Sequence, residues 1–254
     1  MTSPLRIGCV KYLNARPLIH GWSGPVDFDH PSALCRKLAG GELDVALVSS
    51  FEYLRDPIYS IVDDVAIAAD GPVFSVFVVH QGAVEKIEAI TLDPASGTSS
   101  NLLRCLLAER NLNPHLTSIA PNESKKCARL LIGDQAIRFR QQYESDYRFW
   151  DLAEEWKRLT GLPFVFALWL IRPGVAQAKE LADALRACRD SNLASLDQLL
   201  SEESEFPPEF RARYFREHLR FGFGPREKEG LLMFRALCEK HGILTRNESE
   251  LRLV

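Results

Sequence analysis

The chain contains 254 residues, of which 46% are hydrophobic and 26% are charged, and its formal net charge at pH 7 is -3. This composition is typical of a globular protein with one large domain or two lobes, and it excludes disordered and fibrous classes. A slightly negative chain has no general field for nucleic acid or an anionic membrane, so we expect neither partner and expect any bound anion to be held locally.

The six cysteines are spread singly along the chain, at Cys9, Cys35, Cys105, Cys127, Cys188 and Cys238. Their spacing matches no metal-ligand pattern and each has apolar neighbours, which predicts free thiols in a reducing compartment and no bound metal. The first residues lack the features of a secretion signal, and no segment approaches the ~20 apolar residues of a membrane span. We therefore expect a cytoplasmic protein.

The first predicted strand covers residues 5–10, and residues 11–18 form a loop that enters a short helix near Pro17. The polar residues Tyr12, Asn14 and Arg16 therefore follow the carboxyl end of a strand, where open α/β sheets bind their ligands. The alternative interpretation is that Asn14 caps the helix and Arg16 lies in solvent.

The same order of strand, small polar residues and helix recurs further along the chain. Residues 31–38 predict a helix that ends at a glycine pair, and residues 44–48 predict a buried strand. Ser49 and Ser50 follow that strand, directly before the next helix begins. We expect both serines to line the same crevice as the polar side chains after the first strand.

Two further strands are predicted at residues 59–65 and 74–79, with a Gly-Pro break between them. The second run is too apolar for an exposed edge, so we expect a central strand that crosses from one lobe toward another. Its only polar residue is Ser75.

A strand at residues 90–93 is followed by a run of small polar residues and a helix over residues 102–107, and the run contains Ser96, Gly97, Thr98 and Ser99. The first amides of a helix have no partner within it and can face an anion, so this segment predicts a carboxylate or phosphate cradle. A well-capped helix is the alternative. One glycine without a following Gly-Lys-Ser excludes the dinucleotide fingerprint and the P-loop.

The second half of the chain begins with a predicted strand at residues 129–132, after which Asp134 is expected to cap a helix. Residues 151–160 predict a helix and residues 164–171 a buried return strand. Four helices are then predicted, at residues 175–190, 192–200, 208–219 and 227–241, and we expect them to pack back on the first lobe. The arginines of the third of these helices predict a solvated face, namely Arg211, Arg213, Arg216 and Arg220.

The alternation of strands and helices predicts an α/β protein with parallel sheets in two lobes. Crossings near residues 76–86 and 164–172 divide the chain into a first lobe of residues 1–85 and 173–254 and a second lobe of residues 86–172. We expect a ligand-binding cleft between the lobes.

Five ordered motifs resemble one family closely: residues 12–17 (YLNARP), 41–54 (GELDVALVSSFEYL), 71–76 (GPVFSV), 92–99 (LDPASGTS) and 132–134 (IGD). The family is the chorismate dehydratases of the futalosine route to menaquinone, and the resemblance extends from about residue 5 to the C-terminal helices. It implies a periplasmic-binding-protein type II-like fold with the substrate between two lobes. It also implies the removal of water from chorismate, without a cofactor, to give 3-[(1-carboxyvinyl)oxy]benzoate.

The resemblance gives each motif a role. The backbone amides and hydroxyls of Gly97, Thr98 and Ser99 would stabilise the ring carboxylate. Ser49, Ser50 and Ser75 would hold the other carboxylate or the hydroxyl, and Tyr12 and Ser96 would also contact the substrate. No histidine falls within a motif, which leaves no evident general base. We therefore expect the substrate's own side-chain carboxylate to take the proton, oriented by Asn14 as the catalytic residue.

Two alternatives remain open from the sequence. One is the sister enzyme of the same pathway and fold, which forms 1,4-dihydroxy-6-naphthoate and would need a histidine in the cleft. The other is a cytoplasmic protein that binds a small carboxylate without reaction.

Overall fold

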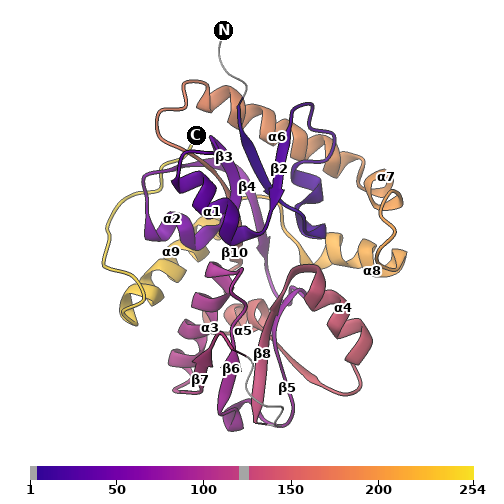
Figure 1. Cartoon of the computed structure of the whole chain (residues 1–254), viewed down its shortest axis with the longest axis vertical. Coiled ribbons are helices and arrows are strands. Elements are labelled where there is room, and N and C mark those ends of the chain that lie inside the picture. Colours follow the sequence, from indigo (N-terminus) through magenta and orange to yellow (C-terminus); the bar gives the residue numbers. More distant parts are fainter. Residues whose placement is uncertain (1–4, 120–125) are drawn as a thin grey trace.

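The computed structural model describes residues 5–119 and 126–254. Within these residues, two five-stranded sheets lie one above the other along the long axis of the molecule, each with helices packed around it (Figure 1). This arrangement confirms the α/β, two-lobed fold predicted from the sequence. Within the same residues, no helix is long and apolar enough to cross a membrane.

The first sheet, in the upper lobe of Figure 1, has the order β2-β1-β3-β10-β4. Its strands are β1 (Ile7–Val10), β2 (Val26–Asp29), β3 (Val45–Ser49), β4 (Ser60–Ala69) and β10 (Phe164–Ile171). β1 pairs in parallel with β2 and β3, whereas β10 runs antiparallel to both β3 and β4. The expectation of a wholly parallel sheet was therefore wrong, because the return strand β10 enters the sheet in the opposite direction.

The second sheet has the order β7-β6-β8-β5-β9. Its strands are β5 (Val76–His80), β6 (Ala89–Thr91), β7 (His115–Thr117), β8 (Cys127–Ile132) and β9 (Arg148–Asp151). β6 is parallel to β7 and β8, and β5 is antiparallel to β8 and β9. This sheet is thus also mixed, because β5 enters it from the first lobe against the direction of its neighbours.

The chain crosses between the lobes at other residues than the sequence predicted. β5 lies entirely in the second sheet and β10 entirely in the first, so neither strand crosses between the lobes as predicted. The chain instead passes from one lobe to the other in the loops at residues 70–75 and 161–163. The crossings differ from the prediction because β5 and β10 are each hydrogen-bonded along both edges within a single sheet, so the chain changes lobes in the loops instead.

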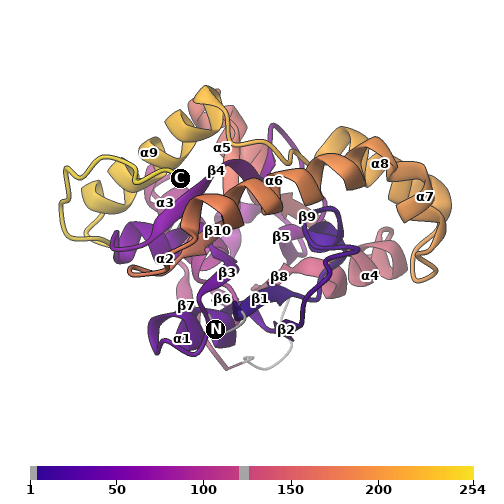
Figure 2. The ribbon, with the colours of Figure 1, turned by 90° about the horizontal axis from the view of Figure 1, so that it is seen from above.

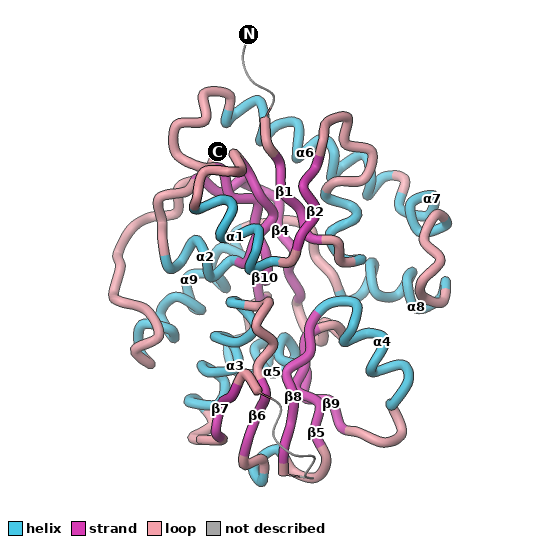
Figure 3. The backbone as a smooth tube through the Cα atoms, viewed as in Figure 1, coloured by secondary structure: helices cyan, strands magenta, loops and turns pink. Residues whose placement is uncertain are grey.

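Helices flank both sheets, as the tube view in Figure 3 shows. They are α1 (Pro31–Ala39), α2 (Ser50–Arg55), α3 (Gly97–Glu109), α4 (Gly133–Tyr143), α5 (Leu152–Thr160), α6 (Ala178–Ala194), α7 (Leu196–Ser201), α8 (Pro208–Arg213) and α9 (Pro225–Lys240). Short 3-10 turns form η1 (Leu13–Leu18) and η2 (Val84–Lys86), and η3 (Tyr214–His218) is a single π-helical segment that continues α8. η1 and α2 therefore begin directly at the carboxyl ends of β1 and β3.

The C-terminal helices pack across the molecule. Seen from above in Figure 2, α6 crosses the top of the first lobe, where it contacts η1 and β4, and α7 and α8 extend to the side above α4. Arg211 of α8 is not solvated as predicted; it is buried, and its guanidinium donates hydrogen bonds to the carbonyl groups of Leu200 and Glu203. These two hydrogen bonds connect the start of α8 to the end of α7 and to the loop between the two helices.

Candidate active site

A cavity lies between the lobes, and seven of the residues singled out in the sequence line it: Tyr12, Asn14, Ser49, Ser75, Ser96, Thr98 and Ser99. Tyr12 and Asn14 follow β1, Ser49 ends β3, Ser75 directly precedes β5, and the other three lie at the start of α3. The ends of these elements thus bring their polar side chains to one place. The space inside for the centres of water-sized molecules is about 70 Å³. The cavity is therefore a narrow space that residues of both lobes line.

The start of α3 presents unpaired amides to this cavity. Ser96 is the N-cap, and its hydroxyl accepts a hydrogen bond from the Ser99 amide at 3.0 Å. In the described part of the chain, the amides of Gly97 and Thr98 have no hydrogen-bond partner. Capping and anion binding are therefore compatible here, because the cap uses one amide and leaves two.

The Thr98 hydroxyl joins the two lobes. It donates to the carbonyl of Phe166 at 3.1 Å, accepts from the Phe51 amide at 3.2 Å and contacts the Ser49 hydroxyl. Because its only proton points to Phe166, Thr98 offers a ligand its backbone amide and not its side chain. This contact ties α3 to α2 and β10.

Ser50 does not face the cavity. Its side chain is fully buried and donates to the carbonyl of Val165 at 2.7 Å. Gly97 lies between Ser96 and Thr98 of the lining, with the Ser49 hydroxyl 3.4 Å from where its Cβ would stand. Ser50 thus anchors the start of α2 to β10, and its single proton is not available to a substrate.

Tyr214 is a residue that the sequence did not suggest, and it connects two residues that were predicted. Its hydroxyl donates to the Ser75 hydroxyl at 2.7 Å, and Asn14 lies beside it within hydrogen-bonding range. Burial raises the pKa of the Tyr214 phenol, whereas hydrogen bonding with Ser75 and Asn14 acts in the opposite direction. The phenol is therefore protonated near neutral pH, which leaves the Ser75 proton free for a ligand. The Asn14 Oδ1 atom is buried without a partner among the described residues.

We expect Tyr214→Phe to lower kcat about tenfold with little change in KM, because Ser75 and Asn14 lose the group that orients them. Loss of one buried hydrogen bond costs ~1 kcal/mol of stability. Tyr53→Phe is the matched control, since Tyr53 is equally buried and its hydroxyl accepts from the Arg252 amide at 2.8 Å, remote from the cavity lining. Equal kinetic constants in the two variants would contradict a positioning role for Tyr214.

Asp134 does not cap its helix as predicted but links the lobes. Both carboxylate oxygens accept from the Leu13 amide, at 3.0 and 3.2 Å, and Leu13 directly precedes Asn14. Next to it, the ring of Tyr12 packs on Gly133, where a Cβ would lie 3.1 Å from three ring atoms and the φ angle is 63°. Only glycine combines that backbone conformation with so close a contact.

The Asp134 carboxyl titrates near neutral pH, because burial raises its pKa to about 6. The native state therefore binds this proton more tightly than the unfolded chain does. The protonated carboxyl stabilises the native state fully below about pH 4, and this stabilisation is lost as the pH rises through 6. Asp134→Asn stays neutral and can still accept from Leu13. We expect the unfolding free energy of Asp134→Asn, relative to the native sequence, to be higher at pH 7.5 than at pH 4.5.

Urea unfolding at both pH values measures this difference. Asp44→Asn is the control, because the Arg6 guanidinium lowers the pKa of Asp44 to about 2 and its contribution is already complete at pH 4.5. A constant difference between Asp134→Asn and the native sequence across this range would contradict the assignment.

The cavity is lined by neutral groups. Among the described residues, no Asp, Glu, His, Lys or Arg side chain lines it. Its one titratable group is the Tyr12 phenol, and burial, together with the charges of Asp93 and Asp134, raises the pKa of that phenol to about 12. Within the same residues, no three His, Cys, Asp or Glu side chains gather as metal ligands. Any negative charge in the cavity must therefore be bound by hydroxyl and amide donors.

Comparison with known proteins gives the family and the fold. The chain matches the menaquinone biosynthesis family over residues 5–240. It is 32% identical over 224 residues to the chorismate dehydratase of Thermus thermophilus, covering 79% of this chain and 82% of that protein.

Two solved structures share the fold. A protein from Archaeoglobus fulgidus has a TM-score of 0.73 at 18% identity, over 94% of this chain and 98% of its own. The periplasmic aliphatic sulphonate binding protein SsuA from Escherichia coli has a TM-score of 0.63 at 13% identity, over 96% and 90%. The likeness to SsuA confirms the periplasmic-binding-protein-like architecture. The chain is a member of the menaquinone biosynthesis family, in the branch that contains the chorismate dehydratases.

Proposed function

We propose that the protein dehydrates chorismate to 3-[(1-carboxyvinyl)oxy]benzoate, as a cofactor-free carbon–oxygen lyase in the futalosine route to menaquinone. The observation that carries the proposal is the cavity itself, whose lining supplies only neutral hydrogen-bond donors and acceptors. The name of the Thermus thermophilus relative supports chorismate as the substrate. Six unpaired cysteines support the cytoplasm as the place of action.

The chemistry needs electrostatic stabilisation more than acid or base groups. Removal of the proton from the ether-bearing ring carbon sends an electron pair through the diene toward the ring carboxylate. The electrons return to expel the neighbouring hydroxyl and complete the aromatic ring. The free amides of Gly97 and Thr98 are suited to hold the ring carboxylate, because they donate without any change of protonation.

The proton acceptor in this proposal is the side-chain carboxylate of the substrate. It takes the ring proton and passes it to the departing hydroxyl, which leaves as water, so that atoms and charge balance. Asn14 orients this carboxylate through its amide N–H, and the unpartnered Oδ1 atom is a ready acceptor for the substrate hydroxyl. Ser75 donates its free proton to the same end of the substrate.

The lining of the cavity argues against the sister enzyme. Formation of 1,4-dihydroxy-6-naphthoate would need a histidine in the cleft, and no histidine lines the cavity among the described residues. His218, on η3, instead contacts the carbonyl of Pro72 at 2.8 Å.

Incubation of the purified protein with chorismate, and separately with the cyclic futalosine derivative, tests the proposal. Proton NMR should show loss of the ring-diene signals of chorismate and growth of aromatic signals of a 1,3-disubstituted benzoate. Chorismate that binds but stays unchanged would favour the non-catalytic carboxylate-binding protein. Conversion of the futalosine derivative alone would identify the sister enzyme.

A further inference from the structure

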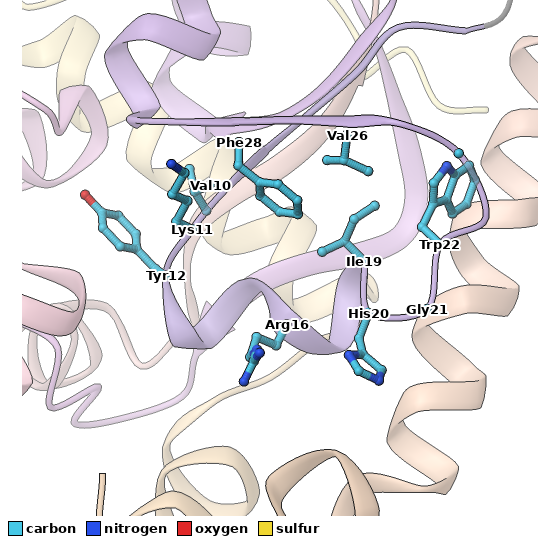
Figure 4. Close-up of a pocket in the computed structure, with 11 residues that line it drawn as sticks. Val10, Lys11, Tyr12, Arg16, Ile19, His20, Gly21, Trp22, Val26 and Phe28 are labelled. Atoms are coloured by element: carbon cyan, nitrogen blue, oxygen red, sulfur yellow. The ribbon is translucent and has the colours of Figure 1, made fainter. Parts of the chain in front are cut away.

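An open groove lies on the first lobe, directly outside the cavity. It runs between η1 and the edge strand β2, and the space in it for the centres of water-sized molecules is about 480 Å³, several times that of the cavity. Figure 4 shows Phe28, Val26 and Ile19 between the strand and the helix, with Trp22 at one end and Lys11 and Tyr12 at the other. Its floor is therefore apolar and partly aromatic.

The exposure of this floor is unusual for such side chains. Phe28 is 43% exposed although its ring lies in the groove, and β2 has no neighbouring strand on its outer side. An exposed aromatic surface in a concave site is the usual setting for an apolar ligand. The groove thus offers contact area to a ring.

One positive charge is available at the end near the cavity. Arg16 and His20, which also line the groove, point away from its floor in Figure 4 and lie against Glu203 and Glu202. Lys11 is exposed and, among the described residues, takes part in no ion pair or hydrogen bond. A ligand with a ring on Phe28 would reach Lys11 with an anionic substituent.

The groove and the cavity share a wall. Val10 and Tyr12 line both, and the Tyr12 ring is held in place by Gly133 of the second lobe. When the lobes separate, Gly133 leaves the Tyr12 ring, and the partition between the two spaces loses its support. A molecule that leaves the opening cavity past Tyr12 therefore meets the groove first.

We propose that this groove holds the aromatic dicarboxylate product after it leaves the cavity, with the ring on Phe28 and one of its two carboxylates at Lys11. The inference rests on the proposed function, which makes a benzoate. The product suits the groove better than the substrate does, because dehydration removes a hydroxyl and creates a flat apolar ring. Such a ring matches an apolar floor with one cation beside it.

Titration of the product into isotopically labelled protein, followed by the indole N–H signal of Trp22 in NMR spectra, tests the groove directly. Trp22→Phe assigns the signal. The signal should shift saturably with the product, and Phe28→Ser and Lys11→Gln should each weaken this binding about fivefold or more. Benzamide, which lacks the carboxylate, should shift it much less. Initial rates with chorismate should stay within about twofold of the native value in both variants, while inhibition by product weakens.

An unmoved Trp22 signal, or identical titrations in all variants, would overturn the proposal. A Trp22 signal that moves with protein concentration alone would assign the groove to a second copy of the chain, which also overturns it. If chorismate is not converted at all, the proposed function fails, and the Trp22 titration still shows whether the groove binds an aromatic carboxylate.

Discussion

Asn14→Asp is expected to lose turnover at least as severely as Asn14→Ala. In the proposed mechanism the Asn14 amide donates to a substrate carboxylate, and loss of a hydrogen bond to a charged group costs ~1.5–3 kcal/mol, or roughly ten- to a hundred-fold in rate. An aspartate of the same shape would be ionised near neutral pH and would repel the substrate. Steady-state kinetics across pH, with circular dichroism to check folding, measures both variants.

Asn113→Asp controls for the added charge, because Asn113 is exposed and lies outside the cavity. Two results would contradict the assignment of Asn14. An active Asn14→Asp enzyme would mean that a carboxylate can serve as the base at this position. Nearly silent substitutions would mean that the side chain acts only as a helix cap. That possibility is already weakened, because the N-cap of η1 is Tyr12, and the Asp134 carboxylate accepts from the first amide of η1.

The second large effect is expected at Asp151, the N-cap of α5. One carboxylate oxygen accepts from the amides of Ala153 and Glu154, at 3.0 and 3.2 Å. The other accepts from Val73 and Phe74, at 3.0 and 2.8 Å, within the first loop that connects the lobes. Asp151 therefore joins the second lobe to the connecting loop through four backbone amides.

Phe74 gives this contact its importance. Its φ angle is 66°, in the left-handed region that non-glycine residues adopt at a cost. The hydrogen bonds that the Val73 and Phe74 amides donate to Asp151 hold it there. Asp151→Ala would leave four amides without their acceptor, so we expect the unfolding free energy to fall by about 3 kcal/mol or more.

Chemical denaturation measures the loss, with Asp146→Ala as the control because Asp146 is an exposed carboxylate of the same lobe. Asp151→Asn should fall between the two, since an amide oxygen can replace only one of the two acceptors. If Asp151→Ala and Asp146→Ala unfold alike, the connecting loop does not depend on this carboxylate.

Residues close to strand ends were the part of the site that could be predicted from the sequence. Tyr12, Asn14 and Ser49 lie at the carboxyl ends of β1 and β3, and parallel strands bring these ends to one edge of a sheet. Ser75 reaches the cavity differently, from the amino end of the antiparallel strand β5. The start of α3 was recognisable for a similar reason, because small polar residues before a helix leave its first amides free. These are local patterns, and the fold preserves them.

The remaining features depend on contacts between distant segments. Tyr214 lies 139 residues from Ser75, in a segment that the sequence predicted only as a helix packed on the first lobe. The Ser50 side chain points to β10, and the Asp134 side chain points to the Leu13 amide. A pattern of residues at a helix start does not reveal either partner. β5 and β10 were predicted to cross between the lobes, because an apolar run does not show to which sheet it belongs.

The structure of the protein with the reaction product bound in the closed cleft tests the central claim most directly, namely that neutral donors between the lobes bind the dicarboxylate. The ring carboxylate should lie at the amides of Gly97 and Thr98, and the side-chain carboxylate should lie within hydrogen-bond distance of Asn14. A product whose carboxylates are held by charged side chains, or that leaves the cavity between the lobes empty, would contradict the account.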